Sequence, residues 1–258
     1  MSLHVESIGS GPPLVVLHGW AMHSGLWMPA LPKLASRFRV HLVDLPGHGH
    51  SRPIAPTTLA GIARAVAEHF ASLPEAPTVL GWSLGGAVAL QWALDRPDAV
   101  GKLILVGTTP CFVARDDWPH AIRAETLRRF GDELATSYRS TLQRFVTLQL
   151  QGSEHAREIL GAMRTQLFAR GAPSRQSLED ALDALAAIDL RSQVGAIAQP
   201  ALVIAGTRDT LVPAAAGAWL AAALPAGRLA SIAGAAHAPF LSHPEAFFAA
   251  AEAFCDGR

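Results

Sequence analysis

Short apolar runs alternate with helix-forming segments along most of the chain, and this alternation constrains the fold more than any other feature. The runs that predict strands cover residues 13–17, 40–44, 78–82, 102–107, 201–206 and 228–233. The segments that predict helices between them cover 57–72, 84–95, 213–223 and 244–256. Strands that alternate with helices form a mostly parallel sheet with helices on both faces. Residues 3–9 could add an antiparallel edge strand.

The alternation stops between Thr109 and Gln199, where only helical patterns are found. One amphipathic face is predicted within residues 132–150, formed by Leu134, Tyr138, Leu142, Phe145 and Leu148. The segment follows a strand directly, so it leaves the sheet at the edge where open α/β sheets bind ligands. We therefore expect an α/β core domain from residues 1–109 and 200–258, with residues 110–199 inserted as a helical lid. A helical bundle stacked on the sheet is the alternative.

Composition excludes several classes of protein. Half of the 258 residues are hydrophobic, and 21 acidic residues balance 21 basic ones, which argues against binding to nucleic acid or to an acidic membrane. The polar start does not predict a signal peptide, and no apolar run is long enough to span a bilayer. The only cysteines, Cys111 and Cys255, are far apart and predict neither a disulfide nor a metal site. We expect a cytoplasmic monomer without cofactor or metal.

A serine between glycines marks the junction of a predicted strand and a predicted helix. Residues 81–85 read Gly-Trp-Ser-Leu-Gly and fit the pattern G-x-S-x-G. A tight strand-to-helix turn of this kind presents its serine at the top of a parallel sheet, beside the positive end of a helix. Ser83 is therefore a candidate nucleophile, although an ordinary glycine-rich turn would have the same pattern.

Two later loops offer the partners that a nucleophilic serine needs. Asp209 follows the strand predicted at 201–206, and His237 follows the one at 228–233. The order Ser, Asp, His is the one that catalytic triads have on such a sheet. Asp44 also follows a strand, but its turn favours a local hydrogen-bonding role. His48 and His50 lack the neighbouring Asp-His pair that a dinuclear metal site would need.

An oxyanion hole requires two hydrogen-bond donors near the reacting carbonyl. The backbone N–H of Leu84, directly after the serine, is one candidate. The second is the backbone N–H of Trp20, in the turn that His18 and Gly19 begin after the first central strand. The Trp20 indole is expected to line the acyl pocket rather than to serve core packing alone.

Together these residues resemble the α/β-hydrolase family over nearly the whole chain. The stretches LHGWAMHSGLW, GWSLGG, PCF, RFVTLQLQG and AAHAPFLSHPEAF are most similar to the carboxylesterases that demethylate pimeloyl-[acyl-carrier protein] methyl ester in biotin synthesis. The resemblance implies a Ser83–His237–Asp209 triad that releases methanol through an acyl-enzyme. It also implies a set of substrate contacts: Trp20, Ser83, Leu84, Phe145, Val146, Thr147, Leu148, Gln149 and His237.

The implied partner is an acidic acyl-carrier protein that holds its substrate on a phosphopantetheine arm. Between residues 121 and 175 the chain has nine arginines against five acids, a surplus of about four positive charges. Arginine binds phosphate and carboxylate groups through its planar fork. By the resemblance, Arg144 and Arg157 lie where the family has basic contacts, and Arg139 and Arg164 lie near two further such positions, occupied here by Ser140 and Gly161. The alternative is a solvated arginine face without a partner.

Other functions remain compatible with these residues. A broad carboxylesterase or lactonase acting on free small molecules would use the same triad. A carbon–carbon bond hydrolase would need polar lid groups for its substrate. A non-catalytic ligand receptor on this fold is disfavoured by the intact Ser83, Asp209 and His237.

Overall fold

A seven-stranded sheet forms the centre of the computed structural model, which describes residues 3–153, 156–171 and 173–257. Its order is β1-β3-β2-β4-β5-β6-β7, and β1 is antiparallel to β3 while the other pairs are parallel. The strands are β1 (Val5–Ile8), β2 (Pro13–Leu17), β3 (Arg39–Val43), β4 (Thr78–Trp82), β5 (Lys102–Val106), β6 (Ala201–Gly206) and β7 (Gly227–Ile232). The predicted strands and the antiparallel edge strand are confirmed.

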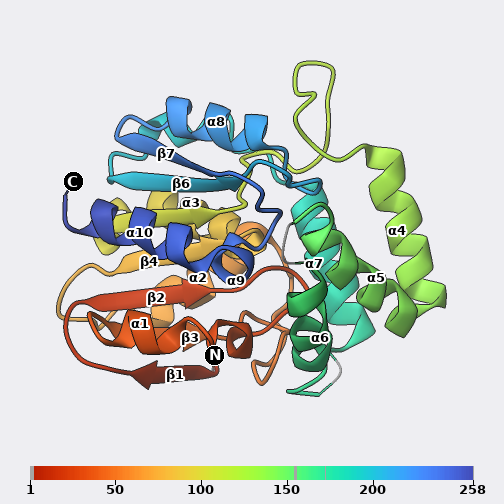
Figure 1. The fold of residues 1–258 in the computed structure, drawn as a ribbon, viewed down its shortest axis with the longest axis horizontal. Helices are drawn as coiled ribbons and strands as arrows, with labels where there is room; N and C mark the ends of the chain where they lie inside the picture. Colours follow the sequence, from red (N-terminus) through yellow and green to blue (C-terminus); the bar gives the residue numbers. More distant parts are fainter. Residues whose placement is uncertain (1–2, 154–155, 172, 258) are drawn as a thin grey trace.

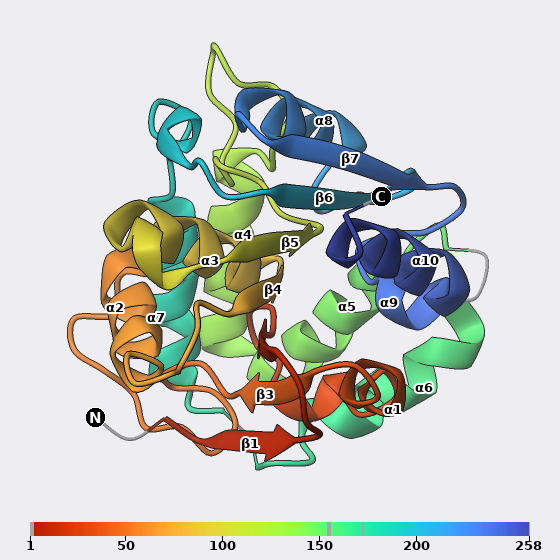
Figure 2. The same cartoon turned by 90° about the vertical axis from the view of Figure 1, so that its left-hand side faces the viewer.

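Helices cover both faces of this sheet, as the alternating pattern predicts (Figure 2). One face carries α2 (Leu59–His69) and α3 (Leu84–Asp95), and the other carries α1 (Leu31–Ala35) and α10 (Pro244–Cys255). Two more helices complete the core: α8 (Ala214–Ala223) packs on β6 and β7, and the short α9 (Pro239–Ser242) precedes α10. The central strands are buried along nearly their whole length, which explains their continuous apolar runs.

The segment between β5 and β6 is helical and lies beyond the carboxyl ends of the parallel strands (Figure 1). It contains α4 (Ala124–Thr136), α5 (Tyr138–Leu150), α6 (Ala156–Leu167) and α7 (Arg175–Ala186). Ahead of α4 the chain forms isolated bridges, Val113 with Ile122 and Arg115 with Trp118. None of the helices in the described part of the chain is both long and apolar enough to cross a membrane.

The amphipathic helix expected across residues 132–150 is two helices. The chain leaves helical geometry at Ser137, with φ −134° and ψ 46°. Hydroxyl groups cluster at this break: the Thr136 hydroxyl donates to Asp132 O at 3.0 Å, and the Thr141 hydroxyl donates to Glu133 O at 3.0 Å. Such side chains compete with the helical backbone for hydrogen bonds, and the apolar periodicity does not register that competition.

Arg170 ties the inserted segment to the sheet through a buried ion pair. Its guanidinium donates to Asp44 Oδ2 at 2.9 Å and also pairs with Glu6. Asp44 additionally accepts hydrogen bonds from Ser24 N and His50 N, at 2.8 and 2.9 Å. Burial opposes ionisation of Asp44, but the adjacent His18 and these backbone donors keep the pKa of Asp44 below its ordinary value. Asp44 thus has the predicted local role together with a long-range one.

Replacing Arg170 with methionine is expected to destabilise the fold by about 3 kcal/mol, since it leaves the fully buried Asp44 carboxylate without its counter-charge. Thermal unfolding should shift down by roughly 6–12 °C. Arg175→Met is the matched control, because the pair of Arg175 with Glu179 is exposed and should contribute less than about 0.5 kcal/mol. Equal shifts for both variants would contradict the anchoring role of Arg170.

Candidate active site

Ser83 lies at the turn between β4 and α3 in a backbone conformation that few side chains adopt. Its φ is 54° and its ψ is −114°. The flanking glycines allow the tight turn, because a Cβ at Gly81 would lie 2.4 Å from Gly85 O and a Cβ at Gly85 would lie 2.5 Å from Leu17 O. The strand-to-helix context expected for the G-x-S-x-G pattern is therefore present.

Asp209 and His237 meet at the carboxyl edge of the sheet. Asp209 Oδ2 lies 2.7 Å from His237 Nδ1, and both side chains are almost completely buried. The other carboxyl oxygen of Asp209 accepts hydrogen bonds from Leu211 N and Val212 N, each at 2.9 Å. With one oxygen fixed by the backbone, the second orients the imidazole so that Nε2 is left for another partner.

The main chain of His237 is held from two sides. The Trp82 indole, directly before Ser83, donates to His237 O at 2.8 Å. The His237 N–H donates to Gln149 O, at the end of α5, at 3.0 Å. The imidazole is therefore positioned by the sheet and by the inserted helices together.

The turn after β2 lies against Ser83. A Cβ at Gly19 would lie 3.3 Å from the Ser83 Cβ. Leu84 is the first residue of α3, so its N–H has no partner within the helix and points out of the helix end. The pair of donors expected from Trp20 and Leu84 belongs to these two turns and remains a prediction.

His18 fixes this turn through its side chain, although the sequence indicates only that His18 begins the turn. Leu45 N donates to His18 Nε2 at 2.9 Å, so the ring proton is on Nδ1, which lies 2.8 Å from Gly19 O. Burial lowers the pKa of His18 to about 3, which keeps the ring neutral. Gly19 O and Trp20 N belong to one peptide plane, so holding the oxygen also sets the direction of the N–H.

An apolar cavity extends from Ser83 and His237 into the inserted segment. The Trp20 indole forms one wall; its Nε1 donates to Leu178 O at 2.9 Å, and it makes edge contacts with Phe130 and Phe145. The lining residues are Trp20, Ser83, Phe112, Ile122, Thr126, Leu127, Phe130, Phe145, Leu148, Leu182, Leu185, Leu211 and His237. The polar groups of Ser83 and His237 thus face a chamber suited to an aliphatic chain.

The residues expected to contact substrate separate into three groups. Phe145 and Leu148 line the cavity together with Trp20, Ser83 and His237. Thr147 is exposed and lines an adjoining groove, whereas Val146 is fully buried in the hydrophobic core. Gln149 is buried, and its side-chain amide has no hydrogen-bond partner within the described chain. Phe112 ends the PCF stretch that carries the resemblance, whereas no pattern in the sequence singles out Ile122 or Leu211, which also line the cavity.

The arginines expected to contact a carrier are all exposed on α5 and α6. Arg144 pairs with Glu133 of α4, and the Arg164 guanidinium donates to the Thr147 hydroxyl at 3.2 Å. Arg139 lies over the Phe168 ring, and Arg157 lies near the start of α6. Arg170, in contrast, points inward to Asp44, so the positive surplus of this segment is not all available at its surface.

Within the described ranges, no three His, Cys, Asp or Glu side chains gather in a way that would hold a metal ion. His48 is buried and close to His18, with ring centroids 5.2 Å apart.

Comparison with known proteins agrees with this fold. A family model described as the alpha/beta hydrolase fold matches residues 12–244, and the chain belongs to the α/β-hydrolase family. It is similar to the pimeloyl-[acyl-carrier protein] methyl ester esterase of Nitrosomonas europaea, at 45% identity over 95% of this chain and 96% of that protein. The protein of the same name from Xanthomonas axonopodis pv. citri is 47% identical over 94% of both chains.

Solved structures show the same architecture. An esterase from Exiguobacterium antarcticum superposes with a TM-score of 0.91 at 25% identity, covering 98% of this chain and 95% of that chain. A bromoperoxidase from Bacillus anthracis superposes with a TM-score of 0.92 at 22% identity, over 98% of this chain and 95% of that chain. The second likeness shows the fold alone.

Proposed function

We propose that this chain is a serine carboxylesterase that hydrolyses the methyl ester of pimeloyl-[acyl-carrier protein] methyl ester in biotin biosynthesis. The observation that carries the proposal is the cavity in which Ser83 and His237 are the reactive groups of an otherwise apolar chamber. The names of relatives that are 43–47% identical over nearly the whole chain support this particular ester.

In the proposed mechanism, Ser83 Oγ attacks the ester carbonyl while His237 accepts its proton. The backbone N–H groups of Trp20 and Leu84 stabilise the oxyanion. The carbon–methoxy bond then breaks, and His237 returns the proton to the leaving oxygen, which departs as methanol. Water, deprotonated by His237, hydrolyses the acyl-enzyme to the free carboxylate and restores Ser83. Asp209 holds the imidazole in the required tautomer throughout.

The inserted segment, residues 110–199, acts in this proposal as a lid that forms most of the acyl chamber. The walls from α4, α5 and α7 are Leu, Phe and Thr side chains, which offer an aliphatic acyl chain apolar contact but few polar groups. A methyl-capped chain fits such a chamber, whereas a chain that ends in a free carboxylate would lose its hydration there. The product is therefore released rather than retained.

The carrier protein is proposed to dock on the exposed arginines of α5 and α6: Arg139, Arg144, Arg157 and Arg164. Reversing two of them in the double variant Arg144→Glu with Arg157→Glu is expected to lower kcat/KM for the carrier-bound ester by about 10- to 100-fold at low salt, because charge complementarity raises the association rate. Hydrolysis of a small free ester should change little, since Ser83, His237 and Asp209 are not altered.

The salt dependence of the two substrates sharpens this test. Raising ionic strength shortens the Debye length from about 10 Å at 0.1 M to about 3 Å at 1 M, so only the carrier-bound ester should lose rate. The matched control is the double variant Arg52→Glu with Arg64→Glu. It makes the same change of charge at two exposed positions outside the inserted segment. Equal losses on both substrates would mean that Arg144 and Arg157 support the fold. A wild type that hydrolyses only the free ester would favour a broad carboxylesterase.

A further inference from the structure

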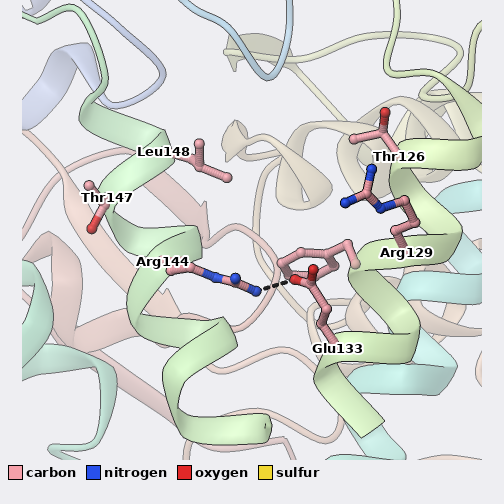
Figure 3. A pocket seen from close by; sticks show the side chains of 7 residues that line it. Thr126, Arg129, Glu133, Arg144, Thr147 and Leu148 are labelled. Carbon is pink, nitrogen blue, oxygen red and sulfur yellow. Dashed lines mark hydrogen bonds and ion pairs between the residues drawn. The ribbon is translucent and has the colours of Figure 1, made fainter. Parts of the chain in front are cut away.

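A groove between α4 and α5 adjoins the catalytic cavity. It encloses about 430 Å³ and is lined by Thr126, Arg129, Phe130, Glu133, Arg144, Thr147 and Leu148. Figure 3 shows Arg129 and Glu133 on α4 facing Arg144 on α5, with the guanidinium groups directed toward the space between the helices. The groove is thus apolar at Phe130 and Leu148 and charged at Arg129, Glu133 and Arg144, with Thr126 and Thr147 between them.

The groove and the cavity share three wall residues. Thr126, Phe130 and Leu148 line both spaces, so the two are separated by the thickness of these side chains. Leu148 is 38% exposed, which is unusual for a large apolar side chain at a cavity wall. The groove therefore lies directly beyond the cavity wall that α4 and α5 form.

The charges of the groove suit a phosphate. No carboxylate of the described residues pairs with Arg129, while Arg144 pairs with Glu133. That pair is exposed, at 59% for the Arg144 side chain and 41% for Glu133, so it contributes little stability and is easily exchanged. Arginine forks bind phosphate oxygens in bidentate fashion. A phosphate between α4 and α5 would thus face two guanidinium groups.

We propose that this groove is the phosphate subsite for the arm of the carrier-bound substrate: Arg129 and Arg144 bind the phosphodiester, and Glu133 is the counter-ion that the phosphate displaces. The proposal rests on the proposed function and extends it to Arg129. It also makes Glu133 a carboxylate that competes with the phosphate for Arg144. The apolar cavity suits the acyl chain, and the charged groove suits the phosphate at the far end of the arm.

The test uses two substrates that differ only in the phosphate: the methyl-pimeloyl thioesters of 4′-phosphopantetheine and of pantetheine. The measured quantity is the ratio of their kcat/KM values. We expect a ratio of about 10 or more for the wild type, which corresponds to one charge-assisted phosphate contact of roughly 1.4 kcal/mol or more. Arg129→Ala should bring the ratio to within about threefold of one, chiefly through KM. Glu133→Gln should raise the ratio by about two- to fivefold, because Arg144 no longer has a competing carboxylate.

Arg128→Ala is the matched control, since Arg128 is exposed on α4 next to Arg129 but does not line the groove. If Arg128→Ala lowered the ratio of kcat/KM values as much as Arg129→Ala, the effect would be one of general charge and the proposed subsite would be wrong. A wild-type ratio near one, with methanol released from the methyl ester of both compounds, would refute the phosphate subsite and leave the proposed function standing. If the protein hydrolysed a simple p-nitrophenyl ester but the methyl ester of neither compound, the proposed function would be refuted instead.

Discussion

Replacing Ser83 with alanine is expected to lower the rate of ester hydrolysis by roughly 10⁴- to 10⁶-fold, the range over which loss of a nucleophile removes the covalent pathway. The residual rate would come from the oxyanion donors and from binding in the cavity. Alanine has the same Cβ at the same positive φ, so the turn keeps its strain and the fold should be retained. Steady-state hydrolysis of a short p-nitrophenyl ester measures the loss.

The control for this variant is Ser36→Ala, which removes an exposed hydroxyl remote from the cavity. Its hydrolysis rate should equal that of the wild type. Thermal unfolding of the Ser83 variant should lie within a few degrees of the wild type. If a correctly folded Ser83→Ala protein kept more than a tenth of the wild-type rate, Ser83 would not be the nucleophile.

The second large effect is expected for Asp209→Asn, with a loss in kcat of about 10⁴-fold. The amide can keep the hydrogen bonds from Leu211 N and Val212 N through its oxygen. Its NH₂ group would then face His237 Nδ1 and donate to it, which forces the ring proton onto Nε2. A histidine protonated at Nε2 cannot accept the proton of Ser83, so the chemical step fails while substrate binding is retained.

This mechanism predicts a loss in kcat with little change in KM, and a folded protein by circular dichroism. Asp98→Asn, at an exposed position far from the cavity, is the control for the loss of a carboxylate and should hydrolyse esters at the wild-type rate. A loss smaller than tenfold for Asp209→Asn would mean that another group orients His237.

The strands and the order of the reactive residues could be predicted because their signals are local. Residues 78–82 are buried on both faces of the sheet and therefore read as a continuous apolar run. The glycines at 81 and 85 are required by contacts within the same turn and with the adjoining strand β2. Since parallel strands all end at one edge, the loops that contain Asp209 and His237 had to approach Ser83.

The walls of the cavity could not be predicted in the same way. Phe112 and Leu211 are about one hundred residues apart and face one chamber only after β5, β6 and the inserted helices have packed. Amphipathic periodicity likewise predicted one helix where the chain forms two, with a break at Ser137. Tertiary contacts decide such features, and a local pattern does not contain them.

The number of arginines in the inserted segment likewise does not predict which of them face solvent. The surplus of arginine is a property of the sequence, but the direction of each side chain depends on its partners. Arg170 is used to neutralise Asp44 in the interior, and Arg144 is paired with Glu133 across two helices. The carrier-binding surface must therefore be tested residue by residue rather than by net charge.

The hydrogen bond from His237 N to Gln149 O couples the main chain of His237 to the position of the inserted helices. Any motion that withdraws α5 from the sheet must break this bond, which is one of the two hydrogen bonds that hold the main chain of His237. An enzyme opened to exchange product for substrate would hold its imidazole less firmly than a closed one. Bulk water would then meet a poorly aligned Ser83–His237 pair, so hydrolysis would be confined to the interval in which the acyl chain is enclosed.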